Sequence, residues 1–211
     1  CRRALDLSKG GDPGRLATAR FRLGFCLLWA DRSGDAIPEL ERSLGEARRV
    51  GDVMLENRAL SYLSIALRRV DDVARARTTA DMARALALQV GDSYYVGHAE
   101  AVLGWCDLRA GDLESAKTHL VTAIEQWGWI EQRGSRGANV EFGWLAAWPL
   151  AAAAVEQGDP ATAARHLALI TTPWERPMSP ELESAVSAAV SDPTMATLNE
   201  ALALARRERL R

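Results

Sequence analysis

The dipeptide Gly-Asp returns at a fixed interval along this chain, and this recurrence constrains the fold more than any other feature of the sequence. Gly11-Asp12, Gly51-Asp52 and Gly91-Asp92 are separated by 40 residues. Glycine favours the C-terminal cap of a helix, and aspartate favours the N-terminus of the next helix. The spacing therefore predicts a stack of one repeated unit, in which each Gly-Asp closes one unit and opens the next.

Small residues recur in the same register between these breaks. A leucine followed by a small residue is repeated, and an alanine comes twelve residues after the small one: Leu23-Gly24 with Ala36, Leu63-Ser64 with Ala76, and Leu103-Gly104 with Ala116. Small residues at the centres of two helices allow the helix axes to approach closely. The pattern predicts two packed helices in each unit, near residues 52–69 and 73–89 in the middle one.

Two further features complete the pattern: a break between the two helices of each unit, and a fourth unit. The expected breaks are Arg32 to Asp35, Asp71-Asp72 and Gly111-Asp112. An insertion near residues 131–141 precedes the fourth unit. That unit is marked by residues in the same register: Leu150-Ala151, Gly158-Asp159, Ala163 and Leu167.

Together, these residues resemble the tetratricopeptide repeat (TPR) signature over residues 13–170. The 40-residue period departs from the usual TPR length of about 34 residues, and longer units are typical of bacterial ATP-dependent regulators. HEAT repeats share the longer period, but the glycine and alanine register argues against them. The resemblance implies an all-α fold, a right-handed superhelical solenoid of TPR-like helix pairs with a period of about 40 residues.

The two ends of the chain differ from the repeats. Residues 1–12 resemble the tail of a second helix, so we expect a truncated repeat and a fragment of a longer protein. An exposed half-repeat is an apolar face, which predicts self-association as a homodimer. Residues 171–211 begin with a Pro-rich bend, followed by a short helix near residues 180–190 and a last helix from Pro193. These are read as capping or linker helices.

Composition and charge exclude several classes of protein. The 211 residues are 48% hydrophobic and 26% charged, with a formal net charge of −2, which is typical of a folded soluble chain. This balance gives no argument for nucleic-acid or membrane binding. The cysteines Cys1, Cys26 and Cys106 lack metal-ligand or redox spacing, which favours reduced thiols and a cytoplasmic location.

The sequence contains no recognisable catalytic or metal-binding motif. It lacks a phosphate-binding G-x-x-x-x-G-K-[ST] loop and a G-x-S-x-G nucleophile motif. The histidines His98, His119 and His166 are too far apart to form a paired ligand motif. We therefore expect no catalytic residues, no metal and no cofactor, unless a closed pocket were to form around His98 and Glu100.

The tryptophans admit two interpretations. Five of the seven fall within 44 residues: Trp105, Trp127, Trp129, Trp144 and Trp148. They either fill the seam between the third unit and the irregular fourth, or line a surface that binds a peptide or small ligand.

The TPR resemblance also implies a binding surface, because in that family the first helix of each unit lines the concave groove. The positions carried over are Phe21, Phe25, Leu28, Trp29, Ser61, Ile65, Arg68, Arg69, Ala101, Trp105, Leu108, Arg109, Trp148 and Ala152, with His98 at the edge. Arg69 and Arg109 fall on one line beside Trp105, a combination that suits a carboxylate or phosphate on an apolar body. Outward solvation of the same arginines is the alternative.

The leading functional hypothesis is a non-catalytic, ligand- or protein-binding module of a larger cytosolic regulator. The segment resembles the region between the ATPase and DNA-binding modules of LuxR-type transcription regulators. Expected partners are a peptide, protein or small effector in the groove and the other domains of the parent chain. We expect no membrane contact and no direct nucleic-acid contact, although the arginine-rich end at residues 206–211 also fits a linker into a DNA-binding domain. The alternative is a stand-alone TPR scaffold for protein–protein interaction.

Overall fold

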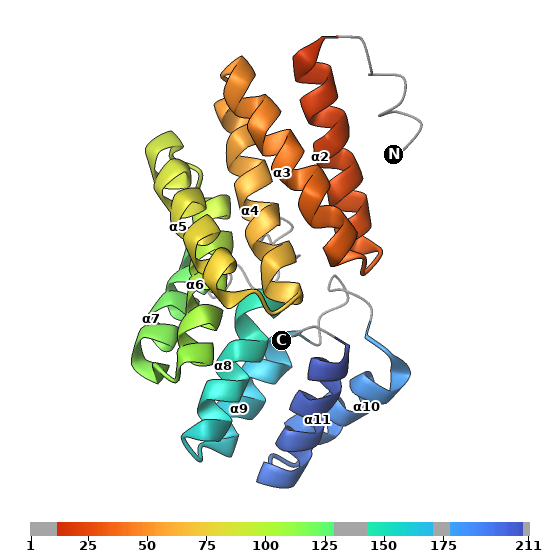
Figure 1. Ribbon diagram of the computed structural model, residues 1–211. Helices are drawn as coiled ribbons and strands as arrows, with labels where there is room; N and C mark the ends of the chain where they lie inside the picture. Colours follow the sequence, from red (N-terminus) through yellow and green to blue (C-terminus); the bar gives the residue numbers. More distant parts are fainter. Residues whose placement is uncertain (1–11, 129–142, 171–177, 209–211) are drawn as a thin grey trace. The chain divides into compact units, whose positions relative to one another are not determined.

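The computed structural model describes residues 12–128, 143–170 and 178–208. These residues form ten α-helices and one short 3-10 helix, and no strand is found among them (Figure 1). The all-α class is therefore confirmed. The helices are α2 (Pro13–Trp29), α3 (Ser33–Val50), α4 (Val53–Arg69), α5 (Val73–Val90), α6 (Ser93–Ala110), α7 (Leu113–Gln126), α8 (Trp144–Glu156), α9 (Pro160–Leu167), η2 (Ala168–Ile170), α10 (Pro180–Ser191) and α11 (Met195–Arg207).

The chain divides into two compact units, residues 1–102 and residues 103–211, and the boundary falls within α6. The expected truncated repeat at residues 1–12 lies outside the described residues except for Asp12, as do the insertion near residues 131–141 and the bend at residues 171–177.

Helix ends in the first unit follow the predicted 40-residue register. Gly51 and Gly91 each adopt a left-handed conformation with φ of 71°, which glycine reaches without a steric penalty. The aspartates that follow, Asp52 and Asp92, accept backbone hydrogen bonds from Leu55 and Tyr95. The Gly-Asp repeats are therefore helix caps, as the sequence predicted.

The break between α2 and α3 is the one that differs from expectation. The sequence predicts this break at Arg32 to Asp35, but α3 already begins at Ser33. The reversal occurs at Asp31, whose φ is 57°, in the same way as Asp71 with φ of 62° forty residues later. Arg32 consequently occupies the N-cap position, where it makes no capping hydrogen bond from its side chain.

Close approach of paired helices follows the small residues. A Cβ atom added to Gly24 of α2 would lie 2.7 Å from Cγ of Leu40 in α3, so the two helices touch where the glycine lies. Ser43 of α3 also donates a hydrogen bond to the Ala17 carbonyl, at 2.9 Å. Arg20 of α2 makes ion pairs with two glutamates of α3, Glu39 and Glu46.

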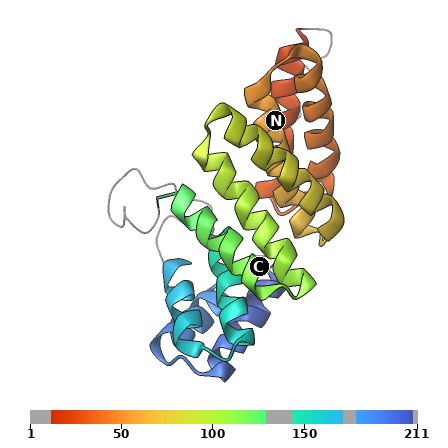
Figure 2. The same ribbon diagram turned by 90° about the vertical axis from the view of Figure 1, so that its left-hand side faces the viewer.

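The second unit contains the fourth repeat and the C-terminal helices, drawn in cyan to blue in Figure 2. Gly158 has φ of 71°, and Asp159 accepts a hydrogen bond from the Thr162 backbone at the start of α9. The helix break predicted at Gly158-Asp159 is therefore confirmed.

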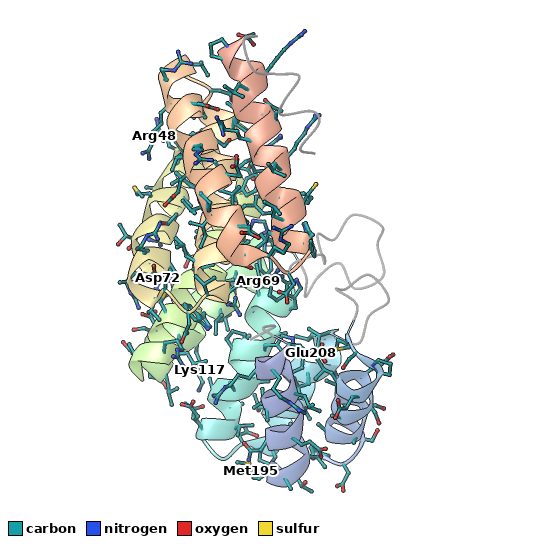
Figure 3. The ribbon with its side chains drawn as sticks, turned by 45° about the vertical axis from the view of Figure 1, so that its right-hand side comes forward. Arg48, Arg69, Asp72, Lys117, Met195 and Glu208 are labelled. Carbon is teal, nitrogen blue, oxygen red and sulfur yellow. The ribbon has the colours of Figure 1, made fainter. Side chains whose placement is uncertain are left out.

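The two terminal helices, α10 and α11, match the expected positions closely. Leu198, Leu202 and Ala205 of α11 are buried, which is the apolar face expected of this helix. Glu208 after α11 accepts hydrogen bonds from the backbone and hydroxyl groups of Ser179, the N-cap residue of α10. Figure 3 labels Glu208 at this junction.

Candidate functional site

Aromatic side chains from three first helices of the repeats meet in the first unit. Tyr62 of α4 lies at the centre, with its ring centroid 5.5 Å from that of Phe21 and 5.1 Å from that of Phe25, both on α2. The same ring lies 5.9 Å from the imidazole of His98 on α6. We call the whole set the aromatic cluster; it comprises Phe21, Phe25, Trp29, Tyr62, Tyr94, Tyr95 and His98.

Most contacts in the aromatic cluster are edge-to-face, the arrangement that the charge distribution of aromatic rings favours. Phe25 and Trp29, for example, have an interplanar angle of 64° and a centroid separation of 5.9 Å. Pairs of this kind contribute about 0.5–1.5 kcal/mol beyond the area that they bury. The contacts therefore hold the rings of three helices in one fixed arrangement.

The aromatic cluster has a buried floor and a partly exposed rim. Tyr62, Tyr95 and His98 are buried, and they form the floor. Phe21, Phe25 and Tyr94 are half-buried, and Trp29 retains 36% of its surface. A partner that approaches this part of α2 would therefore meet rigid, partly exposed rings.

The floor carries no formal charge at neutral pH. Burial lowers the pKa of His98 from 6.5 to about 3, so the imidazole is neutral. Burial also raises the pKa of Tyr95, and the Arg58 guanidinium, hydrogen-bonded to that side chain, opposes the rise. Because neither group is ionised, the floor suits apolar or aromatic groups rather than an ion.

Arg69 is buried in the first unit, where it makes a hydrogen bond between α4 and α2. Its Nη1 atom donates a 2.7 Å hydrogen bond to the carbonyl of Leu28 in the last turn of α2. The same carbonyl also accepts the Asp31 backbone N–H at 3.2 Å, so Arg69 adds a charged donor at the C-terminal end of α2. Its position at the end of α4 is labelled in Figure 3. Neighbouring Arg68 is buried as well.

The expected groove residues thus differ in exposure. Ser61, Ile65, Arg68, Arg69 and His98 of the first unit are buried. Phe25 and Trp29 reach the surface at least in part. The candidate site therefore lies around the rim of the aromatic cluster.

In the second unit, the two tryptophans assigned to the groove are buried and the arginine is exposed. Trp105 of α6 and Trp148 of α8 are almost fully enclosed, whereas Arg109 is exposed. Trp127 and Trp144 are also buried, and Trp129 lies outside the described residues. The burial of four of these five rings favours the packing interpretation over the ligand-surface interpretation.

One buried polar residue of the first unit is not singled out by the sequence pattern. Asn57 of α4 is completely buried, and neither polar atom of its amide has a hydrogen-bond partner in the described part of the chain. Ser61 lies one turn further along α4, and its hydroxyl oxygen is also buried without a hydrogen-bond partner among the described residues. A polar residue at 57 stands out in the 40-residue register, because Ala17 and Gly97 occupy the equivalent positions.

The pair suggested for an enzyme, His98 and Glu100, is buried in the first unit. His98 is neutral and buried, and Glu100 is buried in an ion pair with Arg84 of α5, at 2.5 Å. Within the described ranges, no group of three or more metal-ligating side chains comes together. The arrangement around these residues supports packing and ion pairing.

Comparisons with known proteins give no family for this chain: neither the family models nor the curated proteins contain a match. Across the described helices, none combines the length and apolar character needed to cross a bilayer.

Proposed function

We propose that this chain is a non-catalytic helical-repeat module that binds a peptide, protein or small effector. The observation that carries this proposal is the aromatic cluster, in which half-exposed rings from α2 and α6 surround a buried floor. Rigid aromatic side chains offer a large contact area at a low cost in conformational entropy, and they are enriched among the residues that dominate binding energy. The uncharged floor favours a partner that contributes an apolar or aromatic group.

We further propose that the module belongs to a larger cytosolic regulator, of the LuxR type that its TPR-like signature resembles. The support is the 40-residue register, in which helix pairs are capped alike at Gly51 and Gly91. Stacked helix pairs of a solenoid contact mainly their neighbours, so a ligand that binds one conformation better shifts the whole array toward it. Binding at this module would in this way bias the activity of attached domains.

The size of the natural protein distinguishes this proposal from its alternative, a stand-alone scaffold. An antibody against residues 13–170 would be used to blot a lysate of the source cells. We expect a band several times larger than the 211-residue chain. A band of the size of this chain would contradict the larger regulator and support the scaffold.

Selection from a random peptide library displayed on phage tests the binding site itself. The selected peptides would be measured against the chain, against the rim variants Phe25→Ala and Trp29→Ala, and against the control Leu88→Ala. Leu88 is a suitable control because it is 58% exposed and lies on α5, outside the aromatic cluster. We expect binding to be lost in both rim variants and kept in the control. Peptides that bind all four proteins equally would refute a site at the aromatic cluster.

A further inference from the structure

Two polar side chains of α4, one helical turn apart, are enclosed without a partner from the surrounding helices. Asn57 and Ser61 are both completely buried. Neither the two polar atoms of the Asn57 amide nor the Ser61 hydroxyl oxygen makes a hydrogen bond to any described residue. Buried amides and hydroxyls are almost always hydrogen-bonded in folded proteins, either to protein groups or to ordered water. The two side chains therefore require a partner from outside the packed helices.

The repeat register explains why the helices leave the amide unbonded. In the first helix pair, Ser43 of α3 donates a hydrogen bond to the carbonyl of Ala17 on α2. Forty residues later, the equivalent positions are Ala83 on α5 and Asn57 on α4. The polar side chain has thus moved from the second helix of the pair to the first. Ala83, which takes the place of the serine, has no side-chain group that could bond the amide.

The other neighbours of Asn57 are equally unable to bond it. Every buried residue of α5 except Thr79 is an alanine: Ala76, Ala80, Ala83 and Ala87. In the first unit Leu55 of α4 packs on Ala17 of α2, and the register equivalents of this contact are Tyr95 of α6 and Asn57. The Tyr95 side chain is hydrogen-bonded to Arg58. Helices α5 and α6 thus cover the site mainly with apolar surface.

The spacing and the chemistry of the two side chains suit one water molecule. Residues four apart on a helix have Cβ atoms about 5–6 Å apart, so one oxygen atom can lie within hydrogen-bond distance of Asn57 and Ser61 at once. An internal water needs about two to four polar partners, and the amide and the hydroxyl supply them. Neither side chain carries a charge, and an enclosed site of this kind disfavours an ion.

We propose that Asn57 and Ser61 bind an internal water molecule, which forms part of the packing between α4 and its neighbours α5 and α6. The second helix pair is hydrated at this level, whereas the first pair is joined directly through Ser43. The water site lies inside the first unit and does not include the rim of the aromatic cluster. It therefore goes beyond the proposed binding function, and neither depends on the other.

Nuclear magnetic resonance on the unchanged chain tests the site directly. The chain contains three asparagines, Asn57, Asn139 and Asn199, so isotope labelling of asparagine alone gives few side-chain signals, and contacts within each residue identify the one from Asn57. Water held longer than the protein takes to tumble gives nuclear Overhauser effects of opposite sign in the laboratory and rotating frames, whereas proton exchange gives the same sign in both.

We expect such a long-lived water contact at the Asn57 amide and none at Asn199, an exposed asparagine of α11. The contact should persist in Ser61→Ala, which has no hydroxyl proton that could relay the signal by exchange. The proposal is overturned if Asn57 shows no such contact, or if the contact disappears in Ser61→Ala.

A mutant cycle on stability tests whether the two side chains share the water. Ser61→Ala removes one hydrogen bond of the bound water, so the equilibrium constant for unfolding in urea should rise about fivefold. In Asn57→Leu the larger apolar side chain excludes the water and leaves the Ser61 hydroxyl unbonded. In that background Ser61→Ala should therefore lower the equilibrium constant, because it removes a buried group without a partner.

Ser43→Ala is the matched control for this cycle. Its hydroxyl is buried as well, but it bonds the Ala17 carbonyl directly, so its effect should be the same with and without Asn57→Leu. An effect of Ser61→Ala that is equal in the two backgrounds would contradict the shared water. If Asn57→Leu does not fold, the water contact measured on the unchanged chain still decides.

Discussion

The contact between Gly24 and Leu40 predicts a strong energetic coupling between these two positions. A Cβ atom at Gly24 would lie 2.7 Å from Cγ and 2.8 Å from Cδ2 of Leu40, well inside the optimum carbon–carbon contact distance of about 3.5–4.0 Å. The equivalent positions forty residues later hold Ser64 and Ala80. Where glycine is replaced by the larger Ser64 on α4, leucine is thus replaced by the smaller Ala80 on α5.

Each single substitution should destabilise the first unit. Gly24→Ser forces atoms into the space of Leu40, and overpacking of this kind costs about 1–3 kcal/mol, partly offset by about 0.5 kcal/mol of improved helix propensity. Leu40 is completely buried, and Leu40→Ala should cost about 2–5 kcal/mol in lost burial and cavity formation.

The double variant Gly24→Ser/Leu40→Ala recreates the Ser64–Ala80 combination. With Leu40 shortened, the serine meets no clash and fills part of the cavity. We expect the double variant to cost about 1–3 kcal/mol less than the sum of the two single variants. Urea denaturation followed by far-ultraviolet circular dichroism would measure the free energies of unfolding.

The matched control is Gly45→Ser in α3, where an added Cβ atom meets nothing within 4 Å. Its effect should add to that of Leu40→Ala within about 0.5 kcal/mol. If Gly24→Ser and Leu40→Ala were equally additive, the steric interpretation of the small-residue register would be wrong.

Three further changes test other parts of the structure. Arg32→Asp should stabilise the chain by about 1 kcal/mol in thermal or urea unfolding, because it supplies the N-cap side chain that α3 lacks; an unchanged stability would contradict the capping argument. Arg69→Met should destabilise by about 1–3 kcal/mol, because the buried Leu28 carbonyl loses a charged donor, whereas exposed Arg49→Met should change little. The pKa of His98 is about 3 in the folded chain and 6.5 in the unfolded chain. Below pH 6.5 the unfolded chain therefore binds a proton that the folded chain does not. The free energy of unfolding consequently decreases as the pH is lowered. Relative to His98→Phe, the free energy of unfolding should fall by about 2–3 kcal/mol between pH 7 and pH 4.5, and parallel pH profiles would show that His98 is not buried as described.

The sequence predicted the features that depend on short-range rules. The helices near residues 52–69 and 73–89 begin and end within one residue of the structure. Their boundaries follow from the cap preferences of glycine and aspartate, which act within one turn of chain. The break at Asp31 was misplaced because an aspartate there takes the left-handed conformation that glycine takes at Gly111.

The site was less predictable, since burial depends on elements far apart in the sequence. Ser61 and Ile65 occupy register positions that would line a groove if their side of α4 were open, yet both are buried. Arg69 acts on Leu28, 41 residues away, and its own position in the repeat does not specify that contact. The tryptophans of the second unit show the same limit, because aromatic residues suit a core and a binding surface equally well.

The position of Trp29 gives the first unit an optical signal of its own. It is the only one of the seven tryptophans in residues 1–102, and its ring touches Phe25 at the exposed end of the aromatic cluster. The difference between the emission spectra of the chain and of Trp29→Phe therefore isolates one fluorophore. Arg22 lies two turns before it on the same helix, so iodide, an anionic quencher, should be concentrated near the ring and acrylamide, a neutral one, should not.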